Sequence, residues 1–276
     1  MIPQEPVQEH YGVGDLTDRI ALALKRAGLD GERLQWSDLA DLDQFHVRGL
    51  AATAELAKGL HLETGATLLD VGCGLGGPAR YLAATRGCHV TGIDLSHPFV
   101  AAARMLAERT CLADRTTFVQ GDALDMPFPN NSFDAAWTQH VAMNIADRAR
   151  FYASIHRVLK PGGKLAIYDV LTGNGDPLLF PVPWARQPEI HFLVVPDAMR
   201  ATLHHAGFAE ISWTDTTEAG LEALAQQQQA LRAAPASGQL GLGVVMGSEL
   251  GQMATNLAQN LKAGRVRLIQ AIVQRD

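Results

Sequence analysis

Apolar residues gather in short runs along the chain, and residues with helical spacing fill the stretches between these runs. Leu68, Leu69 and Val71 form the first run, which is typical of a buried strand. The same pattern predicts strands near residues 67–71, 89–93, 116–119, 134–138, 164–169, 208–214 and 265–273. It predicts helices near residues 78–85, 97–109, 147–158 and 196–206. Such alternation indicates an α/β fold on a mostly parallel sheet, with helices on both faces.

Other segments flank and interrupt this core. Residues 1–62 predict an N-terminal helical segment, whose first helix is capped by Asp15. We expect residues 63–276 to form the core domain with two cap insertions. The insertion at 172–195 is rich in proline, glycine and aromatic residues, and the one at 217–263 has helical spacing. We expect the N-terminal segment and the first insertion to close over a substrate.

Turn chemistry marks the start of the fifth strand. The sequence Lys-Pro-Gly-Gly at residues 160–163 predicts a turn, because proline and glycine supply the backbone angles that tight turns require. We therefore expect the fifth strand to begin after this turn and to end at Asp169.

The first strand breaks into a glycine-rich turn that contains Gly72, Gly74, Gly76 and Gly77. Glycines at the carboxyl end of a strand let the backbone approach a ligand closely. The amides that open the following helix then point outward as donors. This segment therefore predicts a site for a nucleotide-like ligand.

Two ligands fit the glycine pattern. Gly72, Gly74 and Gly77 match G-x-G-x-x-G, and Asp94 lies where a dinucleotide site has its ribose-binding acid. However, Asp70 precedes the first glycine, where a carboxylate can face an ammonium group that a pyrophosphate does not have. This favours S-adenosylmethionine over a dinucleotide.

Acids at two further strand ends favour the same ligand. Asp94 ends the second strand and can accept both ribose hydroxyls, and Leu95 beside it can form a wall against adenine. Asp122 and Ala123 follow the third strand, where a carboxylate and a backbone amide can contact the adenine edge. The expected cofactor is S-adenosyl-L-methionine.

The chain resembles the class I S-adenosylmethionine-dependent methyltransferases, on four segments that occur in the family's order. These are LLDVGCGLGGPARYLA, VTGIDLS, GDALDMPFPNNSFDAAW and HRVLKPGGKLAIYD. Within that family the chain is most similar to the branch that acts on small molecules, which includes sarcosine and dimethylglycine, sterol, quinone and natural-product methyltransferases. The resemblance implies a Rossmann-like fold.

The resemblance also implies roles for residues outside the glycine turn. In relatives, the N-terminal segment folds over the methionine end of the donor, which makes Gln44, His46 and Tyr11 candidate cofactor contacts. Gln139 and His140 follow the fourth strand, whose carboxyl end faces the ligand crevice in an open parallel sheet.

Candidate catalytic and acceptor-binding residues follow from the same arrangement. His140 and Asp169 are the candidate catalytic groups. Many relatives carry a histidine where this chain has Asn144, and a neutral amide cannot take a proton at pH 7. We expect Asn144 to contact the acceptor together with three residues of the first insertion: Phe180, Trp184 and His191.

The composition of the chain argues against several classes of protein. The net charge of −6, with no dense basic stripe, argues against nucleic-acid binding. Three cysteines without C-x-x-C spacing, and no apolar run long enough to span a bilayer, indicate a cytoplasmic protein. No cluster has metal-ligand spacing, so we expect no metal. The C-terminal helices could pair two copies of the chain as a homodimer.

Taken together, these patterns predict transfer of a methyl group to nitrogen or oxygen of a small molecule by in-line displacement. One alternative is a protein that binds the donor but catalyses a non-methylating reaction such as cyclisation. The other is a nicotinamide-dependent oxidoreductase, which rests on the G-x-G-x-x-G match alone.

Overall fold

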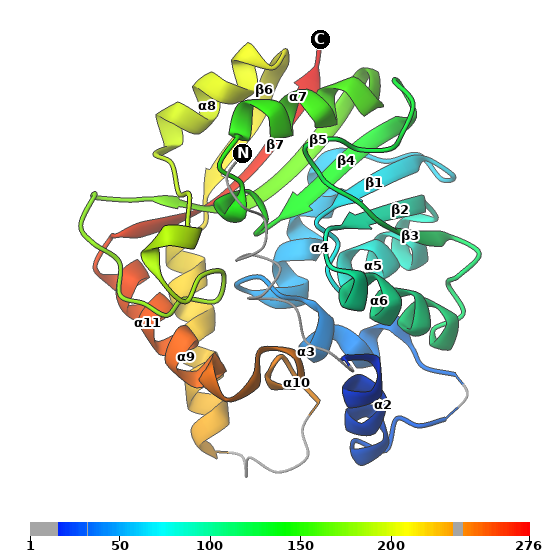
Figure 1. Cartoon of the computed structure of the whole chain (residues 1–276), viewed down its shortest axis with the longest axis vertical. Coiled ribbons are helices and arrows are strands. Elements are labelled where there is room, and N and C mark those ends of the chain that lie inside the picture. The colour runs from blue at the N-terminus through cyan, green and yellow to red at the C-terminus, as the bar shows by residue number, and fades with distance from the viewer. Residues whose placement is uncertain (1–15, 32, 234–239) are drawn as a thin grey trace.

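A seven-stranded sheet forms the centre of the part of the chain that the computed structural model describes, residues 16–31, 33–233 and 240–276 (Figure 1). The strands are β1 (Thr67–Val71), β2 (His89–Asp94), β3 (Thr116–Gln120), β4 (Phe133–Gln139), β5 (Leu159–Thr172), β6 (Phe208–Asp215) and β7 (Val266–Arg275). Their order is β3-β2-β1-β4-β5-β7-β6. β1 to β5 run parallel, and β7 is antiparallel to both β5 and β6. The predicted Rossmann-like, mostly parallel sheet is confirmed.

The fifth strand departs from its predicted bounds at both ends. Phe133 pairs with Leu159 and Ala135 pairs with Lys164, so residues 160–163 form an excursion within β5. Gly162 has a φ of +74° in this excursion, which explains why a glycine stands in the predicted turn. The expectation that this strand ends at Asp169 is wrong, because pairing with β7 continues to Thr172.

Helices cover both faces of the sheet and extend beyond it (Figure 1). The α-helices are α2 (Leu16–Arg26), α3 (Ala40–Asp43), α4 (Gly49–Leu60), α5 (Gly77–Arg86), α6 (His97–Arg109), α7 (Arg148–Val158), α8 (Pro196–His205), α9 (Thr217–Ala233), α10 (Gly243–Met246) and α11 (Leu250–Lys262). Short 3-10 turns are η1 (Trp36–Leu39), η2 (Ala142–Asn144), η3 (Pro188–Ile190) and η4 (Gly247–Glu249). None of the described helices has the length and apolarity needed to cross a bilayer.

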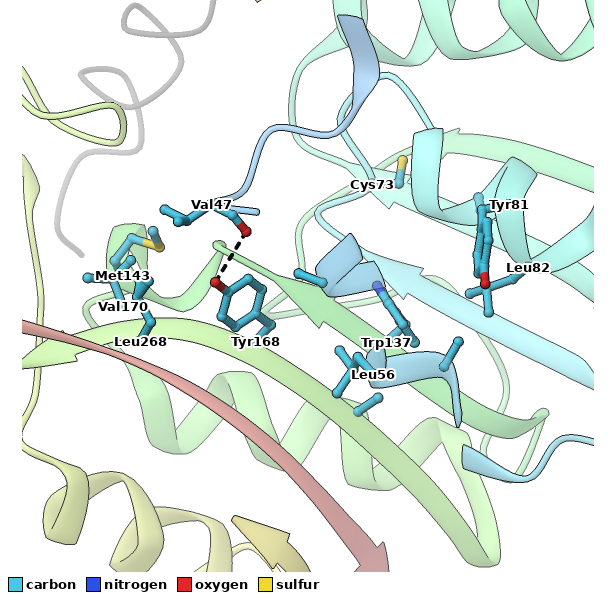
Figure 2. Packing of buried hydrophobic residues seen from close by; sticks show 14 of the residues in the cluster. Val47, Leu56, Cys73, Tyr81, Leu82, Trp137, Met143, Tyr168, Val170 and Leu268 are labelled. Carbon is cyan, nitrogen blue, oxygen red and sulfur yellow. Dashed lines mark hydrogen bonds between the residues drawn. The ribbon is translucent and has the colours of Figure 1, made fainter. Parts of the chain in front are cut away.

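Each face of the sheet has its own apolar core, because neighbouring strand residues point to opposite faces. Leu68 packs with α4 and α5 residues on one face, whereas Leu69 packs with α7 and α8 residues on the other. Figure 2 shows the first of these cores, in which the Tyr168 hydroxyl donates to the Val47 carbonyl at 3.2 Å. This bond ties β5 to the chain just before α4.

A third core joins the N-terminal segment to the second insertion. Leu16 and Ile20 of α2 pack with Leu106 of α6 and with Val245 of α10. The Arg19 guanidinium also donates to the Val244 carbonyl. The segment around α10 is therefore held against α2, on the side of the molecule where the strands β1 to β4 end (Figure 1).

Candidate functional site

A cavity of about 1810 Å³ lies beyond the carboxyl ends of β1 to β4. Neighbouring strands β1 and β4 are the point where the strand order reverses, which is where ligands bind in open α/β sheets. We call the wall formed by lining residues 70–74, 93–96, 121–124 and 139–141 the strand-end side. Residues of α3, α4, the first insertion and the α9–α11 region form the remaining walls.

The glycine turn has no room for side chains at Gly72 and Gly76. Gly72 has a φ of +72°, and a Cβ added there would collide with the Val141 side chain. Gly72 and Gly74 line the cavity, as the sequence predicted. Gly76 does not, and a Cβ there would lie 2.5 Å from the Phe118 ring. Packing against Phe118, rather than ligand contact, therefore explains the glycine at this position.

The buried carboxylate of Asp70 and the half-buried carboxylate of Asp94 lie at the ends of the neighbouring strands β1 and β2. Asp94 accepts the backbone amides of Gly74 and Ser96, each at 2.9 Å, so the glycine turn is held to the second strand. Asp70 is buried and its Oδ2 has no hydrogen-bond partner. Burial, and then the charge of Asp94, raise the pKa of Asp70 to about 7. Burial also raises the pKa of Asp94, although its two amide bonds oppose this. This end of the cavity therefore favours a cation.

The predicted adenine contacts also line the cavity. Leu95, Asp122 and Ala123 are all part of the strand-end side. One Asp122 oxygen accepts the Leu124 amide at 2.8 Å, so this carboxylate also caps its own turn. Asp122 therefore lies in the cavity wall, and its contact with the adenine edge stays a prediction.

The end of β4 presents an amide whose direction is fixed by an indole. Trp137 Nε1 donates to Gln139 Oε1 at 2.9 Å. Because an indole nitrogen can only donate, Oε1 must face Trp137 and Nε2 must point elsewhere. Gln139 lines the cavity, and its Nε2 is buried without a partner. This Nε2 can therefore donate a hydrogen bond to an oxygen of a bound ligand.

His140 has an unusual backbone for a histidine. Its φ is +53°, in the left-handed region that side-chain-bearing residues adopt rarely and that clusters at functional sites. Its amide donates to the Tyr168 carbonyl at 2.7 Å. The ring centroid lies 4.8 Å from that of Tyr168 and 6.0 Å from that of His46. The strained backbone holds the imidazole in the cavity wall.

Burial keeps His140 in its neutral form and also opposes formation of the imidazolium. Burial, and then the proximity of His46, lower its pKa well below the usual range. The imidazole is therefore neutral at physiological pH, and one of its nitrogens can accept a proton. Nε2 of His140 is buried without a hydrogen-bond partner.

The N-terminal segment brings Gln44 and His46 to the cavity. The Thr53 hydroxyl donates to Gln44 Oε1 at 2.7 Å. His46 Nε2 lies 2.9 Å from the Gly49 carbonyl, which can only accept, so this nitrogen carries the proton. Burial lowers the pKa of His46 to about 4, which keeps the ring neutral. Tyr11 lies outside the described residues.

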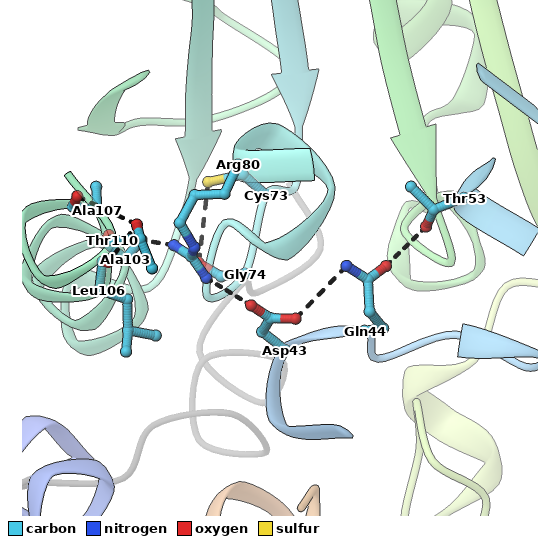
Figure 3. A network of polar contacts seen from close by, with 10 residues as sticks. All are labelled: Asp43, Gln44, Thr53, Cys73, Gly74, Arg80, Ala103, Leu106, Ala107 and Thr110. Carbon is cyan, nitrogen blue, oxygen red and sulfur yellow. Dashed lines mark hydrogen bonds and ion pairs between the residues drawn. The ribbon is translucent and has the colours of Figure 1, made fainter. Parts of the chain in front are cut away.

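A buried ion pair fastens this segment to the glycine turn (Figure 3). Arg80 Nη2 of α5 donates to Asp43 Oδ2 at 2.7 Å, and the two side chains are 1% and 2% exposed. A Cβ at Gly77 would lie 2.5 Å from the Asp43 carbonyl oxygen, so the backbones also meet closely. Burial raises the pKa of Asp43 to about 6, against the opposing charge of Arg80.

Asp169 is not where the sequence analysis expected it. The side chain is completely buried within β5, and Oδ1 accepts the Val141 amide at 3.1 Å. The residue does not line the cavity. Its carboxylate therefore holds the turn that follows His140, and contact with a substrate is not supported.

The predicted acceptor-binding residues divide into two groups. Asn144 and Trp184 line the cavity, and Asn144 Nδ2 donates to the Trp184 carbonyl at 2.8 Å. Asn144 thus holds the first insertion in place. Phe180 and His191 pack against each other with ring centroids 5.4 Å apart, and neither lines the cavity. The described cavity lining does not support direct contact of either residue with the acceptor, which stays a prediction.

Sequence reasoning missed the residues that orient the site. The Asp43–Arg80 pair and the Thr53–Gln139 contact span 37 and 86 residues, which a local pattern does not report. Two local signals were present, however. Trp137 and Gln139 are two residues apart on β4 and so point to the same face of the sheet. Arg80 lies in α5 between Ala79 and Tyr81, where an arginine that becomes buried needs a partner.

Among the described residues, no group of three or more His, Cys, Asp or Glu side chains is placed to hold a metal ion. The chemical groups of the described cavity lining are carboxylates, amides, two guanidinium groups and two neutral imidazoles.

Comparison with known sequences shows which family the chain is similar to. The sequence family described as a methyltransferase domain matches residues 69–167. An O-methyltransferase of Aspergillus nomiae is 35% identical over 193 residues, which cover 68% of this chain and 84% of that protein. A sterol 24-C-methyltransferase of Gibberella zeae is 43% identical over 116 residues, which cover 42% of this chain and only 30% of that protein.

A solved structure is similar over nearly the whole chain. The cyclase SpnF shares 26% identity and superposes with a TM-score of 0.66, covering 96% of each chain. The described fold, including its cap helices, is thus similar from end to end to a protein that its printed name identifies as a cyclase.

Proposed function

The chain belongs to the class I S-adenosylmethionine-dependent methyltransferases, and we propose that it transfers the donor's methyl group to a nitrogen or oxygen atom of a small molecule. The family follows from the similarity to the Aspergillus enzyme over most of both chains. The acceptor atom and the mechanism are our proposal.

One observation carries the proposal: the buried carboxylate of Asp70, with no partner for Oδ2, beside the glycine turn. A buried carboxylate without a cation is destabilising. The ammonium group of S-adenosylmethionine supplies that cation, and the ribose hydroxyls can donate to the remaining lone pairs of Asp94. A dinucleotide would instead bring a pyrophosphate next to Asp70, where the two negative charges repel. The residues present therefore fit the donor and disfavour a nicotinamide cofactor.

When bound, the donor supplies a methyl carbon that is already electrophilic because it is attached to a sulfonium. The chain's own residues need to align the acceptor behind that carbon and exclude water. Gln139 Nε2 and the amides of the glycine turn can hold the donor, while Thr53 and Trp137 hold Gln139 and its neighbours. Proximity and alignment then supply most of the acceleration.

His140 supplies what a hydroxyl acceptor additionally requires. Its neutral imidazole can accept the hydroxyl proton as the oxygen attacks the methyl carbon. An amine acceptor that is already neutral needs no such base. We therefore assign His140 as the base for hydroxyl acceptors.

A second function follows from the similarity to SpnF. A protein of this fold could hold the donor for structural reasons and catalyse cyclisation of a bound substrate instead. The observation that favours this alternative is the similarity along 96% of both chains, cap included.

Calorimetric titration with S-adenosylhomocysteine, and separately with NADH, tests the donor site. We expect saturable binding of S-adenosylhomocysteine and none of NADH. Asp94→Asn should weaken that binding by about tenfold or more, because charge-assisted hydrogen bonds to the ribose are lost. Asp114→Asn is the matched control, since Asp114 is exposed and does not line the cavity. Binding of NADH alone would refute the proposal.

Methyl-labelled donor, incubated with pools of phenols, alcohols and amines and read by product mass, then separates the two functions. A labelled product supports methyl transfer. Donor binding without a labelled product, together with an unlabelled rearranged product, would favour cyclisation.

A further inference from the structure

Part of the cavity is lined by residues of α9, by residues 240–246 and by residues of α11, and Pro183 and Trp184 line it as well. We call this region the acceptor arm. We propose that the acceptor is an uncharged, largely apolar molecule, that its body fills the acceptor arm, and that a single reactive heteroatom reaches His140. This inference rests on the proposed function and adds the class of substrate.

The distribution of charge separates the two regions. Six aspartates and two arginines line the described cavity: Asp41, Asp43, Asp70, Asp94, Asp122, Asp147, Arg48 and Arg150. None of these eight belongs to the acceptor arm. The described lining residues of the arm after position 217 are all uncharged, and leucine is the commonest among them.

A charged acceptor would find no described partner in this arm. Outside the arm, Arg48 pairs with Glu55 but has a buried Nη1 without a partner, and Arg150 donates to the Leu124 carbonyl at 3.0 Å. A phosphate or carboxylate within the arm would lose its hydration and meet no cation among the arm's own described lining residues. Those residues include no carboxylate either, although the Asp41 backbone carbonyl lies 3.7 Å from the position of a Cβ at Gly241.

The size of the cavity points to a large acceptor. Pockets for small ligands usually have volumes of about 300–1,000 Å³, and this cavity measures about 1810 Å³. Under the proposed function the donor fills the strand-end side, which leaves the acceptor arm for the acceptor.

Small residues create the width of the arm. Gly241, Gly243, Gly251 and Ala254 all line it. A Cβ added at Gly251 would have no heavy atom within 4 Å, so a side chain at this position would project into open space. Larger side chains at these positions would fill part of the arm, so the small residues keep it open.

Apolar lining makes burial of an apolar body favourable at about 25 cal/mol for each Å² removed from water. Leu224, Leu242, Met246, Leu250 and Leu257 provide that lining. The polar side chains of the arm's described lining are Gln227 and Gln228 of α9, together with the Trp184 indole nitrogen, which is buried without a partner. The arm therefore recognises shape and apolar surface through its many apolar residues, with a few uncharged polar groups beside them.

The uncharged fluorophore N-phenyl-1-naphthylamine, titrated into the full chain, tests this inference. Farnesol and farnesyl phosphate then serve as competitors, because they share an apolar body and differ in charge. We expect saturable fluorophore binding, displacement by farnesol, and displacement by farnesyl phosphate that is at least tenfold weaker. Equal displacement by the two competitors would overturn the inference.

Gly251→Leu tests where the fluorophore lies. It places a side chain into the arm on helix α11, where leucine is a better helix former than glycine, so folding should be preserved. We expect fluorophore affinity to fall at least tenfold while S-adenosylhomocysteine affinity stays unchanged. Gln259→Leu is the matched control, since Gln259 is exposed on the same helix and does not line the cavity.

The outcomes distinguish this inference from the proposed function. Unaltered fluorophore affinity in Gly251→Leu would place the apolar site elsewhere and overturn the inference, even if S-adenosylhomocysteine binds normally. Failure of S-adenosylhomocysteine to bind, with the fluorophore results as expected, would refute the proposed function and leave the apolar site established.

Discussion

The strand-end side and the acceptor arm occupy one cavity, but different parts of the chain define them. On the strand-end side, backbone amides and carboxylates are fixed by the sheet, as when Asp94 holds the amides of Gly74 and Ser96. In the acceptor arm, the shape comes from small residues such as Gly251 and from apolar side chains on helices outside the sheet.

The difference teaches how the two ligands are recognised. Directional hydrogen bonds and charge select one invariant polar molecule, and they tolerate little change in geometry. Apolar contact selects by volume and tolerates change, because it is not directional. One side of the cavity can therefore stay constant while the other varies.

Replacement of His140 should have the largest effect. His140→Asn keeps a residue that tolerates positive φ, so the backbone should hold. For hydroxyl acceptors we expect kcat to fall roughly 100- to 10,000-fold, because a general base is lost. For amine acceptors we expect little change. Single-turnover assays with both acceptor classes would measure this, and an equal loss for both would show that His140 has another role.

Removing the cation of the buried Asp43–Arg80 ion pair should have the second-largest effect. Arg80→Met leaves Asp43 buried without a partner, which should cost about 3–5 kcal/mol in the free energy of unfolding. Urea denaturation would measure this loss. Arg186→Met removes half of a pair whose side chains are about half exposed, and should cost less than about 1 kcal/mol.

The same variant has a predictable pH dependence. Because the folded-state pKa of Asp43 is already raised to about 6, loss of Arg80 should raise it further. A carboxyl with a raised folded-state pKa stabilises the protein at low pH and loses that contribution as pH rises. Arg80→Met should therefore be less destabilising at pH 5 than at pH 8. An equal loss at both pH values would show that Asp43 stays charged.

Asp70→Asn should separate the two sides of the cavity. The substitution keeps the size of the side chain and removes its charge, so S-adenosylhomocysteine affinity should fall roughly 10- to 100-fold. Binding of N-phenyl-1-naphthylamine in the acceptor arm should be unchanged. Parallel titrations measure both, and a matching loss of the two affinities would mean that the sides are not independent.

The pH dependence of donor binding is the smallest expected effect. The pKa of Asp70 is raised to about 7 in the free protein, so the carboxyl must lose its proton to pair with an ammonium. The ionised fraction increases about tenfold between pH 6 and pH 8, and S-adenosylhomocysteine affinity should rise by a similar factor. Asp70→Asn should abolish this rise. Calorimetry at both pH values would detect it.

Sequence alone predicted the strand-end side well, because its signals are local. The glycines and acids follow directly from buried strands, and parallel strands bring their carboxyl ends to the same edge. The mostly parallel sheet was therefore accessible from alternation of strands and helices, whereas the strand order came from the structure. The contacts of Asp70 and Asp94 with the donor remain predictions.

Residues whose position depends on distant partners were not accessible in the same way. Asp169 was expected at a strand end, but antiparallel pairing with β7 extends the strand beyond it. Phe180 and His191 were expected at the acceptor because of their residue type, yet they pack against each other and neither lines the cavity. Residue type within an insertion does not reveal which side chains face the cavity.

The helices that form the acceptor arm leave the sheet after β6 and return at β7, which are hydrogen-bonded neighbours. Thr216 and Leu268 are joined there by a backbone bond of 2.8 Å. A segment with adjacent ends can change in length at a small entropic cost, since the cost of closing a loop grows only slowly with its length. Changes in the length and sequence of the arm can therefore give the same scaffold a new substrate, provided that they keep the packing of α10 on α2.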